Sequence, residues 1–143
     1  MSDFVKEIGR SSDYVISACE CDGVFVLCDD LLVRDCRKYI QDTLSERELL
    51  EQLAEECMEL GHVALKQIRA KKLSPNATPL HRAAVIVPFL EEQLDVMSIL
   101  WLLTGNKMYE HIRNYPKYVR WAQRLGYKIP EKYILKEAEH EPE

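Results

Sequence analysis

Two long segments, residues 45–72 and 88–105, constrain the fold most, because apolar side chains recur in both at helical spacing around acidic residues. The first opens with Ser45 and Glu48 in the S-x-x-E pattern that caps a helix N-terminus. The second is followed by Gly105, a typical C-cap residue. Helices of this length have to bury their apolar faces, so the sequence predicts a mainly α fold, a helical bundle.

Each of these segments carries two carboxylates on or beside its apolar face. Residues placed 100° apart around the first helix put Glu56 on the apolar stripe, Glu59 at its edge and Glu55 toward solvent. Glu92 and Asp95 repeat the i, i+3 spacing in the second helix. Four carboxylates in one apolar interior cannot all stay ionised without cations. All-oxygen ligands favour Mg²⁺, with Mn²⁺ as the alternative.

Two other metal sites fit the sequence less well. A di-iron bundle needs Glu-x-x-His pairs, but here the residues three positions after the lead glutamates are Glu59 and Asp95. A zinc site would have to use cysteines that form no C-x-x-C pair and have no nearby histidine. These are Cys19, Cys21, Cys28 and Cys36. With Cys57 the chain has five cysteines, and this odd number predicts reduced thiols in the cytoplasm.

The two acidic segments together carry a family resemblance. "LLEQLAEECMELGHVALKQIRA" followed by "FLEEQLDVMSILWLL" resembles the MazG-like all-α nucleoside triphosphate pyrophosphohydrolases, whose signature is E-E-x-x-E and then E-x-x-D. The match spans about residues 45–105. The resemblance implies a catalytic helical domain over residues 45–143. Residues 1–44 match no part of the family and are expected to form an N-terminal hairpin and short helix.

The resemblance implies Mg²⁺-dependent hydrolysis of an NTP or dNTP to the monophosphate and pyrophosphate. Glu55 and Glu56 are the candidate catalytic residues, with Glu55 orienting or deprotonating the attacking water. The implied metal ligands are Glu56, Glu59, Glu92 and Asp95. Asn106, Lys107 and Lys117 follow the second motif and are candidates to bind the phosphates of the substrate.

The remaining segments are shorter. Residues 13–28 pair two β-prone runs across Asp22-Gly23, which predicts a tight hairpin. A short helix follows, with Leu32, Cys36, Tyr39 and Ile40 at helical spacing. Thr78-Pro79 can restart a helix after the loop, and Pro88 then kinks it or begins a separate segment. We expect short helices at the C-terminus, broken at Pro116 and at residues 126–130.

The charge distribution is uneven along the chain. Residues 1–60 hold 15 Asp and Glu against 6 Lys and Arg, whereas residues 106–136 hold 8 Lys and Arg against 2 Glu. This arrangement suits a metal-bound anionic ligand, or simply two solvated faces, and does not favour nucleic acid as a partner. The sequence has no apolar run of about 18 residues and no signal peptide. We therefore expect a cytoplasmic protein that does not bind membranes.

A second function remains open beside the enzyme, namely a catalytically idle helical protein that binds a nucleotide or nucleic acid. Interleaved aromatic and basic residues near the C-terminus would favour it, unless they pack against the bundle. Separately, the second long helix is apolar on the side opposite its carboxylates, so a homodimer or homotetramer is expected. The side chains on that side are Leu90, Leu94, Met97 and Trp101.

Overall fold

The computed structural model describes residues 6–11, 14–73, 75, 81–106 and 114–135 of the chain. Over these residues the protein is mainly helical, with four α-helices and a small antiparallel sheet. The chain divides into two compact units, one made of residues 1–43 and 115–143 and the other of residues 44–114. The first break lies next to the expected boundary at residue 44, whereas the C-terminal segment groups with the N-terminal one.

The sheet of the first unit confirms the hairpin and adds a strand. The strands β1 (Lys6–Ser11), β2 (Tyr14–Cys21) and β3 (Val24–Cys28) pair antiparallel in that order. Between β2 and β3, Asp22 and Gly23 both have positive φ, at 52° and 84°. Two consecutive residues with positive φ make the type I′ turn that matches strand twist, which explains the Asp-Gly pair.

Two helices from distant parts of the chain complete the first unit. Helix α1 (Asp30–Thr43) packs against α4 (Tyr115–Arg124), and α4 also contacts β2 and β3. The Tyr115 hydroxyl donates a hydrogen bond to Asp30. Pro116 lies in the first turn of α4, where a missing N–H costs nothing, so it begins this helix and does not break it. A 3₁₀ turn at Glu131–Tyr133 follows.

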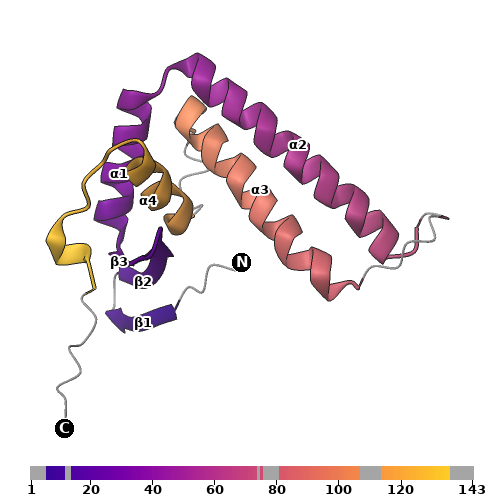
Figure 1. Cartoon of the computed structure of the whole chain (residues 1–143), viewed down its shortest axis with the longest axis horizontal. Coiled ribbons are helices and arrows are strands. Elements are labelled where there is room, and N and C mark those ends of the chain that lie inside the picture. Colours follow the sequence, from indigo (N-terminus) through magenta and orange to yellow (C-terminus); the bar gives the residue numbers. More distant parts are fainter. Residues whose placement is uncertain (1–5, 12–13, 74, 76–80, 107–113, 136–143) are drawn as a thin grey trace, which may run out of the picture. The chain divides into compact units, whose positions relative to one another are not determined.

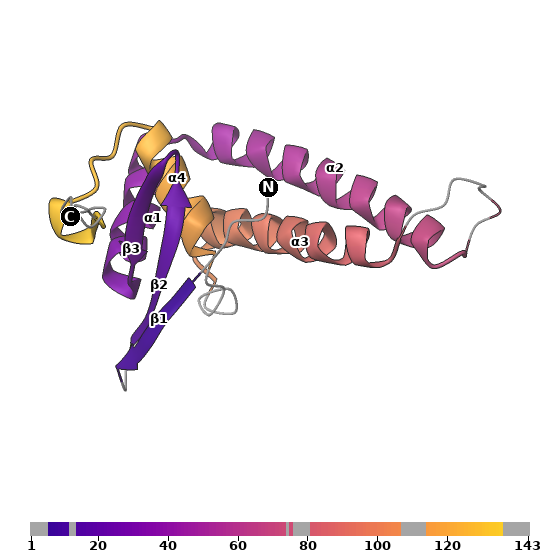
Figure 2. The same ribbon diagram turned by 60° about the horizontal axis from the view of Figure 1, so that its bottom comes forward.

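The second unit is a helical hairpin. Helices α2 (Glu46–Ala70) and α3 (Ala83–Thr104) lie side by side and run antiparallel (Figures 1 and 2). The capping box of Ser45 and Glu48 is confirmed, as is Gly105, the left-handed C-cap of α3 with φ 59°. Pro88 lies inside α3, which starts five residues earlier at Ala83. The expected restart at Thr78-Pro79 lies outside the described residues.

No helix in the described part of the chain combines the length and apolar character needed to cross a bilayer.

Candidate metal centre

Three carboxylates from the two long helices meet in the middle of the hairpin. Glu56 points inward from α2 and is only 8% exposed, and Glu92 and Asp95 lie half-buried on α3. One carboxylate oxygen from each lies within 4.8 Å of the others. The apolar periodicity of α2 explains the burial of Glu56, because it shares its face with Leu49 and Val63.

Glu92 lies in an unfavourable electrostatic environment. Its Oε2 is buried and accepts no hydrogen bond. Burial, together with the negative charges of Glu59, Asp95 and Glu56, raises the pKa of Glu92 to about 7. A bound cation would stabilise a buried oxygen that accepts no hydrogen bond and lies among other negative charges. The orphaned oxygen and the all-oxygen donor set fit a hard divalent ion such as Mg²⁺ or Mn²⁺.

Two amide side chains orient the carboxylates. Gln52 Nε2 donates to Glu55 Oε2 at 3.0 Å and reaches Glu56 Oε1 at 3.4 Å. Asn114 Nδ2 donates to Asp95 Oδ1 at 2.6 Å. Sequence reasoning missed both amides. Gln52 could have been found from its position one helical turn before Glu56, but no spacing rule links Asn114 to a residue 19 positions away.

The other residues expected at the site lie outside the group of three. Glu59 is exposed, although its charge acts on Glu92. Glu55 is exposed beside Gln52. Asn106 is exposed just beyond the end of α3. Lys117 belongs to α4 in the other unit, and Lys107 lies outside the described residues.

The four N-terminal cysteines cannot share one zinc ion. All four thiols are buried in the first unit, and Cys19 Sγ lies 3.4 Å from Cys21 Sγ. However, Cys28 pairs with Ser17, which is four residues along β2 from Cys21. At about 3.3 Å per residue, the backbones of Cys21 and Cys28 are about 13 Å apart, too far for one tetrahedral site. These thiols therefore act as small core side chains.

Two tyrosines of α4 are packed in the interior, whereas Trp121 on the same helix is half-buried. Tyr118 is fully buried and Tyr115 is 5% exposed, so neither ring is free to stack on a base. Arg37 lies over the Tyr118 ring, with 5.5 Å between the guanidinium carbon and the ring centroid. For these described residues the packing interpretation holds. Tyr109 and Arg113, which also belong to the interleaved aromatic and basic residues near the C-terminus, lie outside the described residues.

Comparison with protein-family models, with curated proteins and with solved structures finds no match to this chain.

Proposed function

We propose that the α2–α3 hairpin binds Mg²⁺, or Mn²⁺, through Glu56, Glu92 and Asp95 and hydrolyses a nucleoside triphosphate to the monophosphate and pyrophosphate. The observation that carries the proposal is the convergence of three carboxylate oxygens within 4.8 Å. Each comes from a motif, E-E-x-x-E or E-x-x-D, whose order and spacing resemble those of the MazG-like pyrophosphohydrolases.

A bound Mg²⁺ would neutralise charge on the phosphate oxygens and lower the pKa of a water molecule. The chain's own residues have complementary tasks. Asn114 fixes the Asp95 carboxylate by donating a hydrogen bond to its Oδ1. Gln52 fixes Glu55 at the rim of the site, where an exposed carboxylate can accept a proton from an attacking water. Glu59 is exposed and its negative charge acts on Glu92, so it is the candidate for a fourth carboxylate ligand.

The test is a screen of the common NTPs and dNTPs with Mg²⁺, with pyrophosphate and orthophosphate measured separately. We expect pyrophosphate, and no stoichiometric orthophosphate, from at least one substrate. Glu56→Gln and Asp95→Asn should each reduce turnover by orders of magnitude and leave the helical circular dichroism signal intact. Glu91→Gln is the matched control, because Glu91 is exposed and is the residue next to Glu92.

Orthophosphate as the sole product would contradict the proposed reaction. Tight nucleotide binding without any turnover would favour the alternative, a catalytically idle nucleotide-binding protein. Wild-type activity in Glu56→Gln would show that the three carboxylates are not the metal centre.

A further inference from the structure

Residues 60–90, which form the half of the α2–α3 hairpin beyond the carboxylates, contain basic residues and no acidic residue. This segment begins after Glu59 and ends before Glu91, so both of its ends lie beside an acidic motif. Its lysines and arginines are Lys66, Arg69, Lys71, Lys72 and Arg82. A local excess of positive charge next to a cluster of carboxylates favours an anionic ligand that also binds a metal ion.

Lys66 and Arg69 are half-buried cations without a counter-ion. Neither forms an ion pair with any residue in the described part of the chain. Their own helix cannot supply a carboxylate, because no acidic residue lies three or four positions from either of them. By contrast, Arg47 near the start of α2 pairs with Glu51 at 2.9 Å. Lys66 and Arg69 are also three residues apart, a spacing at which like charges destabilise a helix, and an anion bound between them would remove this repulsion.

Lys66 lies on the same side of α2 as two of the candidate site residues. At 100° per residue, Glu55 and Glu59 each project within about 20° of Lys66, and Arg69 projects about 60° away from it. Lys66 follows Glu59 by about 10 Å along the helix axis. Side chains in an α-helix lean toward its N-terminus, so the long side chains of Lys66 and Arg69 extend back toward the metal centre.

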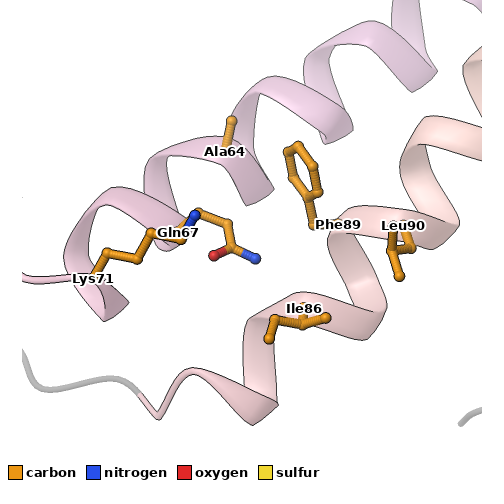
Figure 3. A pocket seen from close by; sticks show the side chains of 6 residues that line it. All are labelled: Ala64, Gln67, Lys71, Ile86, Phe89 and Leu90. Carbon is orange, nitrogen blue, oxygen red and sulfur yellow. The ribbon is translucent and has the colours of Figure 1, made fainter.

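The pocket of the hairpin lies on a different side of α2. It has a volume of about 350 Å³ and lies between the two helices (Figure 3). Its lining residues are Ala64, Gln67, Lys71, Ile86, Phe89 and Leu90. Lys66 projects about 100° from Gln67, and Asp95 projects about 120° from Phe89 in the same rotational sense. Because α2 and α3 are antiparallel, rotations of the same sense lead to the same side of the hairpin (Figures 1 and 2). Lys66 therefore lies on the side of Asp95, whereas Lys71 faces the pocket.

We propose that Lys66 and Arg69 bind the β- and γ-phosphates of the substrate, the two phosphates that leave as pyrophosphate. The assignment rests on the proposed function, in which the metal centre holds the α-phosphate. A polyphosphate that extends from the carboxylates along this side of α2 meets Lys66 and Arg69, and each can donate charge-assisted hydrogen bonds to phosphate oxygens. The bound anion also separates two cations that otherwise repel each other.

In the reaction, both cations act on the leaving group. The water oxygen forms a bond to the α-phosphorus and its proton passes to Glu55, while the bond from the α-phosphorus to the α–β bridging oxygen breaks. That oxygen leaves with the bonding electron pair, so negative charge accumulates on pyrophosphate. Lys66 and Arg69 stabilise this charge in the transition state. A nucleoside diphosphate has no γ-phosphate, so the two cations also favour triphosphate substrates over diphosphates.

Calorimetric titration of the full chain with pyrophosphate in the presence of Mg²⁺ tests this site without any turnover. The wild type should bind pyrophosphate. Lys66→Gln and Arg69→Gln should each weaken the affinity about 10-fold, the typical effect of losing one hydrogen bond from a charged group. Lys71→Gln is the matched control, because it removes the same charge from the same end of α2 on the pocket side. It should bind pyrophosphate with the wild-type affinity.

Product inhibition supplies a readout that a purely structural role would not change. With an NTP that the protein hydrolyses, inhibition by pyrophosphate should weaken about 10-fold in Lys66→Gln. Inhibition by the nucleoside monophosphate should stay the same, because this product retains only the α-phosphate at the metal centre.

Pyrophosphate that fails to bind the wild type, or that binds Lys66→Gln and Arg69→Gln as tightly as the wild type, would overturn the assignment. An equal loss of affinity in Lys71→Gln would overturn it as well, because only the overall charge of the helix end would then matter. If NTP hydrolysis persisted in either case, the proposed function would stand without these two residues. A wild type that binds pyrophosphate through Lys66 but hydrolyses no NTP would support the anion site and contradict the proposed reaction.

Discussion

Replacing Glu92 by glutamine should stabilise the metal-free protein at alkaline pH and have little effect at acidic pH. The folded-state pKa of Glu92 is about 7, against 4.5 for an unperturbed glutamate. Because the folded state binds this proton more tightly, Glu92 is neutral in both states well below pH 4.5 and does not oppose folding there. As the pH rises from 4.5 to 7, the unfolded chain ionises first and the free energy of unfolding falls. Above pH 7 Glu92 is ionised in both states, and the folded protein is destabilised by the full free energy of the pKa difference.

The size of the effect follows from the difference between the two pKa values. Each pKa unit corresponds to about 1.4 kcal/mol, so ionised Glu92 destabilises the apo protein by about 3 kcal/mol above pH 7. Part of that cost is screened, because Glu92 is only half-buried, and about 3 kcal/mol is therefore an upper bound. Glutamine keeps the shape of the neutral acid and cannot ionise. The free energy of unfolding of Glu92→Gln should exceed that of the wild type by up to this amount at pH 8 and by almost nothing at pH 4.

The assay is urea unfolding with a chelator present, at equal protein concentrations, at pH 4, 6 and 8. Glu91→Gln serves as the control, because its side chain is exposed and should show no comparable pH-dependent gain. A Glu92→Gln variant that is destabilised at pH 8, or that differs from the wild type by the same amount at every pH, would refute the reasoning. Such a result would mean that the carboxylates do not share one low-dielectric site.

Two further substitutions test the surroundings of the site. Asn114→Ala removes the 2.6 Å hydrogen bond to Asp95 and should weaken Mn²⁺ binding by about 10- to 100-fold. The binding is measured by electron paramagnetic resonance. Asn106→Ala, a substitution at an exposed position, is the control and should bind Mn²⁺ with the wild-type affinity. An unchanged affinity in Asn114→Ala would show that this amide does not position the ligand. Ser45→Ala removes the capping box of α2 and should lower the free energy of unfolding by about 1 kcal/mol. Thr43→Ala, at an exposed position, is the control and should have a smaller effect. Equal losses of stability in the two variants would contradict the prediction.

Local signals in the sequence predicted the local structure well. Asp22-Gly23 located the turn between β2 and β3, and Ser45 with Glu48 located the start of α2. Helical periodicity alone placed Glu56 on the inward face. These predictions succeed because a turn type, a cap and a helical face each depend on a few neighbouring residues.

Features that depend on contacts across the chain were not predicted. Strand β1 has no apolar alternation of its own and is recognised only by its pairing with β2. Asn114 reaches Asp95 only through the tertiary fold. The buried cysteines illustrate the same limit, because the register of β2 and β3 decides their separation. The family resemblance and the reaction it implies stay predictions that the proposed assays decide.

The first unit is assembled from both ends of the chain, which has a consequence for the order of folding during synthesis. Its hydrogen bonds join residues 85 and 102 positions apart, as between Tyr115 and Asp30 and between Arg124 and Asp22. Residues 44–114, by contrast, pair α2 with α3, which are consecutive in the chain and separated by residues 71–82. On a ribosome the hairpin can form as soon as α3 has emerged, while α1 and the sheet wait for α4 with their apolar faces uncovered. That waiting nascent segment, and not the hairpin, is where a chaperone would be most needed.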